Sequence, residues 1–122
     1  SASESIIDSM PSTLTAKTLC DWSKENIKHA DFSGPLALDL IFSNQAAKIK
    51  GLKDNQVSGR ANGVIVPDIV SGNTLFKSLV YLGGGCAAGL VVGAKVPLIL
   101  TSRADPPAAR LASIALASIS QR

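Results

Sequence analysis

The sequence has few of the residues from which metal centres and disulfide frameworks are built. It contains one histidine, His29, and two cysteines, Cys20 and Cys86, which lie far apart. Metal sites need several such ligands at short spacing, so the sequence predicts that no metal is bound. Isolated cysteines are typical of buried free thiols in a reducing compartment, and we therefore expect a cytoplasmic protein.

Aromatic residues and clustered charge are also scarce. There are one tryptophan, one tyrosine and three phenylalanines, and twelve scattered basic residues face nine acidic ones for a net charge of +3. Proteins that bind nucleic acids combine clustered basic residues with aromatic side chains that stack on bases. We expect no nucleic-acid partner. The small excess of positive charge is compatible with an anionic ligand.

The sequence has no long uninterrupted hydrophobic run. Its longest apolar stretch, 86–100, is broken by Gly89, Gly93, Lys95 and Pro97, and is too short for a transmembrane helix. The first residues have neither the basic segment nor the apolar core of a signal peptide. We expect no membrane association, and the absence of an initiator methionine suggests a processed, trimmed or fragmentary chain.

The apolar residues that are present, 46% of the chain, are mostly valine, isoleucine, leucine and alanine, which suit buried strands flanked by helices. Turn residues divide them into alternating helices and strands. This alternation predicts an α/β fold with a mostly parallel sheet flanked by helices. The predicted helices span 12–28, 36–48, 73–82 and a segment from 106 onward, and the predicted strands span 30–33, 63–66, 87–92 and 96–100.

Three polar residues follow the last predicted strand, and a proline-opened helix comes next. They are Ser102, Arg103 and Asp105. In open α/β sheets, ligands bind beyond the carboxyl ends of the strands, so this junction is the candidate site. The planar guanidinium of Arg103 suits a phosphate, although a solvated surface arginine is the alternative. Asp105 precedes a proline pair and is also well placed as a helix N-cap, which does not exclude a catalytic role.

A glycine pattern at 83–88 formally matches the dinucleotide-binding fingerprint G-x-G-x-x-A. A true fingerprint follows a strand and opens a helix, whereas these glycines follow a predicted helix and precede a strand. We therefore predict that they terminate the helix. Asp68 and Asn73, nearby, are residue types common in turns and caps.

Several short segments together carry a family resemblance. They are 10–13 (MPST), 33–39 (SGPLALD), 46–51 (AAKIKG), 66–73 (VPDIVSGN), 89–93 (GLVVG) and 97–105 (PLILTSRAD). In this order they resemble the phosphate acetyltransferase/phosphate butyryltransferase family, over nearly the whole chain from about residue 10.

The resemblance implies acyl transfer: acyl-CoA and phosphate give acyl phosphate and coenzyme A, and the reverse. The expected partners are therefore acyl-CoA, phosphate and acyl phosphate, with coenzyme A as a substrate and no bound cofactor or metal. The implied fold is phosphotransacetylase-like, with the three-layer architecture of isocitrate and isopropylmalate dehydrogenases. The resemblance also implies two α/β domains with the site between them, and a protein that forms a homodimer.

The resemblance also implies roles for the candidate residues. Arg103 would hold the reacting phosphate, Ser102 would hydrogen-bond the reacting thiol or carbonyl, and Asn73 would contact substrate. A carboxylate would accept the thiol proton. In the best-known acetyl-type members it lies several residues beyond the arginine, but here 106–109 contains no acid. Asp105 is the nearby candidate.

Members of the family are more than twice as long as this chain, which resembles their C-terminal portion. Residues 1–95 would then belong to the second domain, and 96–122 would return to complete the first, whose N-terminal half is absent. We expect the parent protein to be an acyltransferase and this chain alone to be inactive. The alternatives are a non-catalytic acyl-CoA-sensing module, such as the C-terminal domain of a malic enzyme, and a structural dimerisation fragment.

Overall fold

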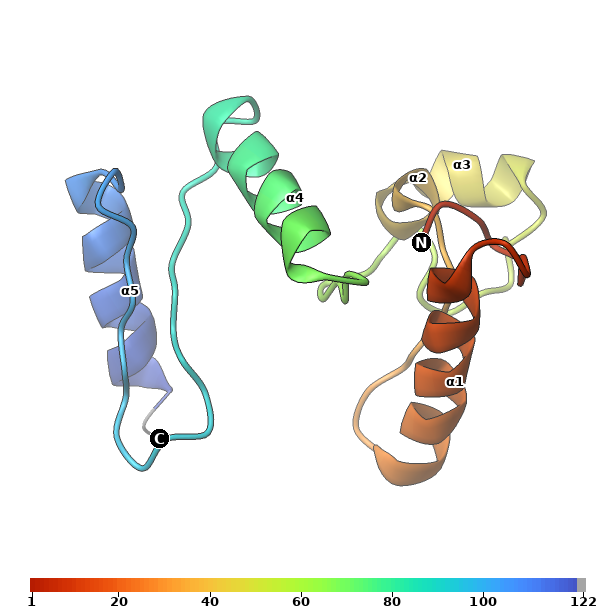
Figure 1. Ribbon diagram of the computed structural model, residues 1–122, viewed down its shortest axis with the longest axis horizontal. Coiled ribbons are helices and arrows are strands. Elements are labelled where there is room, and N and C mark those ends of the chain that lie inside the picture. The colour runs from red at the N-terminus through yellow and green to blue at the C-terminus, as the bar shows by residue number, and fades with distance from the viewer. Residues whose placement is uncertain (121–122) are drawn as a thin grey trace. The chain divides into compact units, whose positions relative to one another are not determined.

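The computed structural model describes residues 1–120. These residues form five helices joined by turns and extended segments (Figure 1). The contacts divide the chain into two compact units, residues 1–72 and residues 73 onward, with the boundary inside α4. The helices are α1 (Pro11–Asn26), α2 (Leu38–Phe42), α3 (Asn44–Ile49), α4 (Ile69–Tyr81) and α5 (Pro107–Ile119).

The core of the first unit lies around α2 and α3. Leu36, Leu40 and Ala47 are buried there. The single helix predicted over 36–48 is wrong, because Ser43 has extended backbone angles and separates α2 from α3. The Ser43 hydroxyl accepts the backbone N–H of Ala46 at 3.1 Å and so caps α3.

The helix predicted over 12–28 is confirmed as α1, which begins at Pro11 as the preference of proline for the first helical turn favours. The residues before it are tied to it by Thr13, which is fully buried. The Thr13 hydroxyl accepts the Ile7 N–H at 3.0 Å and donates to the Met10 carbonyl at 2.8 Å. The strand predicted at 30–33 does not form.

The second unit is organised by the small residues on one face of α5. Ala109, Ser113 and Ala117 are buried at intervals of four residues. The Ser113 hydroxyl accepts the Gly89 N–H at 3.0 Å and donates to the Ala109 carbonyl at 2.8 Å. Small side chains at these three positions let the extended segment around Gly89 lie directly against the helix.

The mostly parallel sheet is not confirmed in the described part of the chain. Between residues 1 and 120 the β pairing is one antiparallel bridge, in which the Val91 N–H donates to the Leu98 carbonyl at 2.9 Å. The strand predicted at 63–66 does not form, and 87–92 and 96–100 are otherwise unpaired. Strands need hydrogen bonds from neighbouring strands, and these segments lack such neighbours among the described residues.

The helix predicted over 73–82 begins earlier, at Ile69, and its predicted glycine terminator is confirmed. The Asp68 carboxylate accepts the Ser71 N–H at 2.8 Å, and this bond lowers the pKa of Asp68. At the other end, the Gly85 N–H donates to the Leu79 carbonyl at 2.9 Å, and Gly84 has a φ of 68°. No helix within residues 1–120 is long and apolar enough to cross a membrane.

Two glycines allow the effect of backbone strain on stability to be measured separately from the effect of steric overlap. Gly51 and Gly59 have similar positive φ angles, 78° and 75°. A β-carbon on Gly59 would lie 2.5 Å from the Asn44 Cα, whereas one on Gly51 would meet nothing within 4 Å. Gly51→Ala should lower the free energy of unfolding by about 1–2 kcal/mol, and Gly59→Ala by at least ~3 kcal/mol. Urea unfolding followed by the fluorescence of Trp22 measures both, and equal losses would contradict the close packing of Gly59 on α3.

The exposed ion pair between Asp39 and Lys50 predicts a pH dependence. The Lys50 Nζ lies 3.0 Å from Asp39 Oδ2, and this contact lowers the pKa of Asp39 and raises that of Lys50. The stabilisation is therefore complete between the ordinary pKa values, about 3.9 and 10.4, and is lost below the lowered pKa of Asp39 and above the raised pKa of Lys50.

Lys50→Met should accordingly return the pKa of Asp39 towards its ordinary value in an NMR titration of the carboxyl group. It should also lower the urea midpoint at pH 7, and by less as the pH falls through the lowered pKa of Asp39. Lys48→Met, in the last turn of α3 two residues before Lys50, is the matched control and should leave the pKa of Asp39 unchanged.

Candidate functional site

The predicted site residues Ser102 and Asp105 are brought together in a tight turn before α5. The Ser102 N–H donates to Asp105 Oδ2 at 2.6 Å, and the Asp105 N–H donates back to the Ser102 carbonyl at 3.1 Å. The Ser102 hydroxyl accepts a long contact of 3.4 Å from the Ala104 N–H. This reciprocal pairing fixes the turn from which the Arg103 side chain projects.

The prediction that Asp105 caps α5 is wrong. The residue at the N-cap position is Pro106, and no side-chain bond caps the helix. The carboxylate of Asp105 is instead directed back to the Ser102 N–H, because the turn places that donor within reach. Asp105 Oδ1 has no hydrogen bond within the described residues, so this oxygen remains available as an acceptor.

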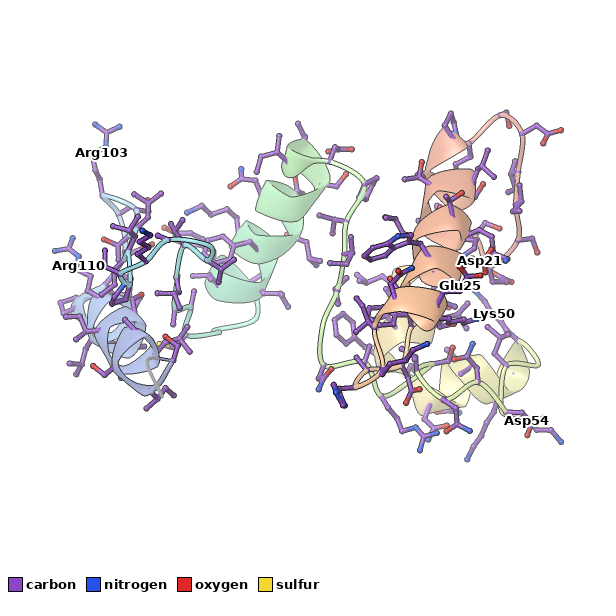
Figure 2. All side chains as sticks on the ribbon, turned by 90° about the horizontal axis from the view of Figure 1, so that it is seen from below. Asp21, Glu25, Lys50, Asp54, Arg103 and Arg110 are labelled. Carbon is purple, nitrogen blue, oxygen red and sulfur yellow. The ribbon has the colours of Figure 1, made fainter. Side chains whose placement is uncertain are left out.

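Arg103 is exposed at the tip of the same turn, and Figure 2 shows its side chain extending away from the chain. It forms no ion pair within residues 1–120. A guanidinium that is free of carboxylate partners keeps all five of its N–H donors for a ligand, and its planar fork can bind a phosphate at two points. The turn therefore presents a cation, a hydroxyl and a carboxylate within four consecutive residues.

Asn73, the predicted substrate-binding residue, lies on α4 in the same unit. It lines a shallow hollow of about 370 Å³ formed by Asn73, Thr74, Lys77, Ser78, Tyr81 and Leu82. No hydrogen bond joins Asn73 to the turn at 102–105 in the described structure. The sequence motif indicated Asn73 alone, although the position of Lys77 four residues later on the same helix could have indicated that the two are neighbours.

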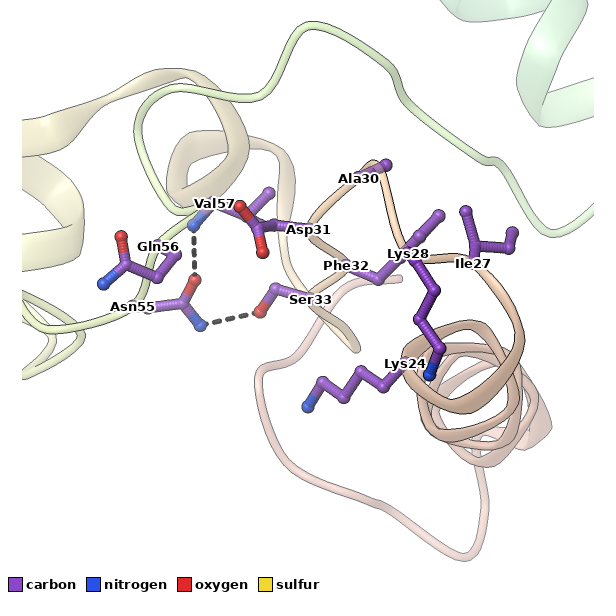
Figure 3. Close-up of a pocket in the computed structure, with 10 residues that line it drawn as sticks. All are labelled: Lys24, Ile27, Lys28, Ala30, Asp31, Phe32, Ser33, Asn55, Gln56 and Val57. Atoms are coloured by element: carbon purple, nitrogen blue, oxygen red, sulfur yellow. Dashed lines mark hydrogen bonds between the residues drawn. The ribbon is translucent and has the colours of Figure 1, made fainter.

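A second hollow, of about 400 Å³, lies in the first unit and contains none of the predicted site residues (Figure 3). Two lysines, Lys24 and Lys28, and the carboxylate of Asp31 line it. One wall is fixed by Asn55, whose amide donates to the Ser33 hydroxyl at 2.6 Å. The hollow brings together no nucleophile with a neighbouring base. No sequence pattern indicates this hollow, because its lining comes from two separate segments of the chain, 24–33 and 55–57.

The cysteines do not form a reactive or metal-binding site. Cys20 is half-buried, and burial raises the pKa of its thiol, which disfavours the nucleophilic thiolate. Cys86 is exposed, so the prediction that both thiols are buried is wrong for this residue. Residues 1–120 contain no group of three or more histidine, cysteine, aspartate or glutamate side chains that could hold a metal ion.

The backbone is similar to a solved phosphotransacylase. The crystal structure of a branched-chain phosphotransacylase from Enterococcus faecalis V583 matches 97% of this chain with a TM-score of 0.84 and 37% sequence identity. The match covers 42% of that protein. This likeness supports the phosphotransacylase-type fold that the sequence resemblance predicts.

The sequence model of the phosphate acetyl/butaryl transferase family matches residues 1–118. Similar relatives include the phosphate acetyltransferase of Rhizobium meliloti, 44% identical over 98% of this chain and 38% of that protein. The phosphate butyryltransferase of Clostridium acetobutylicum is 41% identical over 97% of this chain and 39% of that protein. The chain belongs to the phosphate acetyl/butaryl transferase family, and it spans less than two fifths of the length of these two relatives.

The orientation of Asp105 predicts an effect on the turn and not on α5. Asp105→Ala removes a charge-assisted hydrogen bond, so the Ser102 amide should exchange its proton about five- to tenfold faster. The amides of Arg110 and Leu111 in the first turns of α5 should change less than about twofold, because Asp105 does not cap the helix. Amide hydrogen exchange followed by NMR measures both groups.

Asp105→Asn is the matched variant, since its side-chain oxygen can still accept the Ser102 N–H. If the amide protons throughout the first turn of α5 exchange faster in Asp105→Ala, then Asp105 does cap the helix, and this description of the turn is wrong.

Proposed function

We propose that the protein to which this chain belongs transfers a short acyl group, acetyl or butyryl, between coenzyme A and inorganic phosphate. The observation that carries the proposal is the turn at 102–105. There a guanidinium with no ion pair among residues 1–120 stands beside a hydroxyl and a carboxylate that share one hydrogen-bonded turn. The names of the related proteins, phosphate acetyltransferase and phosphate butyryltransferase, support the same chemistry.

Arg103 is the residue best suited to the phosphate. In the direction that forms acyl-CoA, the single bond between the carbonyl carbon and the phosphate oxygen breaks, and the phosphate leaves with its electron pair. A bidentate guanidinium stabilises the charge that develops on that leaving group. Arg103 has the reach and the free donors for this role, because it extends from the turn and forms no ion pair within residues 1–120.

Ser102 and Asp105 suit the other reacting group. The thiol of coenzyme A attacks the carbonyl carbon as the thiolate, so its proton must pass to a base as the carbon–sulfur bond forms. Asp105 Oδ1 is free to accept that proton, while Oδ2 holds the Ser102 N–H. The Ser102 hydroxyl can donate to the thiolate or to the carbonyl oxygen.

We further propose that residues 96–122 complete a sheet with a part of the parent protein that this chain lacks, and that 1–95 belong to the other domain. The exposure of Val96 (61%) and Leu100 (74%) supports a missing sheet neighbour for 96–100, since a strand buried in a complete sheet would have these side chains covered. The parent would act as a homodimer without a metal or resident cofactor, with coenzyme A as a substrate.

The experiment is a thiol-release assay on the full-length parent, with acetyl-CoA or butyryl-CoA, in the presence and absence of phosphate. Release of coenzyme A that depends on phosphate is expected, and the two rates rank the acyl groups. No release, together with measurable binding of coenzyme A, would overturn the proposal in favour of a regulatory acyl-CoA-binding module.

Arg103→Ala in the parent should lower kcat/KM by at least about thirtyfold, which corresponds to ~2 kcal/mol of lost transition-state stabilisation. Arg110→Ala is the matched control, because Arg110 is also exposed in the second unit but lies on α5 outside the turn (Figure 2). It should change kcat/KM less than about twofold. If the two variants behave alike, Arg103 has no role in the reaction.

A further inference from the structure

The hollow on α4 combines four polar side chains that have no role in the mechanism proposed above. Its lining residues recur at intervals of three and four positions along α4 and the residue that follows it, so they share one face. Asn73, Thr74, Lys77 and Ser78 contribute an amide, two hydroxyls and an ammonium group. Tyr81 and Leu82 form its apolar border.

Lys77 is held in place by aromatic rings. Its Nζ lies 5.2 Å from the centre of the Phe76 ring and 5.5 Å from the centre of the Tyr81 ring, within the range of cation–π attraction. It forms no ion pair within the described residues. None of the side chains that line the hollow is acidic, so Lys77 gives it a net positive charge.

Three polar side chains of this face keep their donors free within residues 1–120. Some helical hydroxyls donate back to the carbonyl one turn earlier, as Thr18 does to Leu14 and Ser118 does to Ile114, each at 3.0 Å. The side chains of Thr74 and Ser78 make no hydrogen bond within residues 1–120, and neither does that of Asn73. The hollow thus gathers one cation and several donors that the described chain does not use.

We propose that this face of α4 binds a phosphate group of a substrate, with Lys77 as its charged anchor and Asn73, Thr74 and Ser78 as hydrogen-bond donors. The inference rests on the proposed function, which supplies substrates that carry phosphate. This chemistry has two sources: inorganic phosphate together with acyl phosphate, and the phosphate groups of coenzyme A. A single lysine with neutral donors binds either by charge and hydrogen bonding.

The test compares Lys77→Ala, Lys77→Gln and Lys77→Arg with the unmodified full-length parent. KM is measured separately for phosphate and for acyl-CoA, and Kd for each ligand is measured by calorimetry. Lys77→Ala and Lys77→Gln should each weaken one ligand about tenfold, the effect of losing one charge-assisted contact. Lys77→Arg should restore most of the affinity. The ligand that weakens identifies the source of the phosphate group.

Lys95→Ala is the matched control, because Lys95 is an exposed lysine of the same unit outside the hollow, and it should leave both affinities unchanged. Circular dichroism checks that each variant is folded. Affinities within about twofold of the parent for both ligands in Lys77→Ala and Lys77→Gln would overturn the inference, as would a parent that binds neither ligand.

Failure of the proposed function has a different signature. The parent would then release no coenzyme A with phosphate, whatever residue stands at position 77. In that case a loss of phosphate or coenzyme A binding in the Lys77 variants would still support the α4 site. Unchanged binding would reject it.

Discussion

The geometry of the second unit depends on the contact between α5 and the extended segment beside it. Ser113 accepts the Gly89 N–H and donates to the Ala109 carbonyl, so one buried hydroxyl satisfies a loop amide without leaving its own proton unpaired. The alanines on either side, one turn away in each direction, keep this face narrow. A larger side chain at any of these positions would push the extended segment off the helix. The turn that carries Arg103 immediately precedes this anchored helix.

The turn itself is organised by backbone hydrogen bonds more than by packing. Ser102 and Asp105 exchange hydrogen bonds, and Arg103 between them is left without a partner in the described residues. This arrangement holds a carboxylate near an arginine without forming an ion pair between them. The separation matters for the proposed chemistry, because an arginine neutralised by Asp105 would bind phosphate less well, and a paired carboxylate would be a weaker base.

Sequence patterns predicted the helices α1, α4 and α5 and the glycine end of α4, and these features are confirmed. All of them depend on neighbours a few residues away in sequence: a proline in a first turn, a carboxylate before Ser71, a glycine with positive φ after Tyr81. The helix predicted over 36–48 failed for a local reason too, since serine can either continue a helix or cap the next one. The role of Asp105 could not be predicted from the sequence. As a helix cap its carboxylate would accept an N–H of α5, whereas in the turn it accepts the Ser102 N–H, and these donors lie only a few residues apart.

The sheet could not be predicted from periodicity in the same way. The segments 87–92 and 96–100 have the composition of buried strands, yet within residues 1–120 they pair only through Val91 and Leu98. The chain spans less than two fifths of the length of the two relatives described, and a strand forms only where a neighbour supplies hydrogen bonds. The composition of a segment indicates that it can form a buried strand, but the strand forms only beside another segment with which it can pair.

By itself the sequence determined the family, the main helices and the residues of the candidate site, because short-range hydrogen bonds and residue preferences act within a few positions. Tertiary structure decided which distant groups meet. It brought the Gly89 N–H to the Ser113 hydroxyl, 24 residues along the chain. The bond between Asp105 and Ser102 and the aromatic contacts of Lys77 are local, but only the folded turn and helix show which of the possible local partners each side chain takes. Spacing along the chain allows several such partners and does not choose among them.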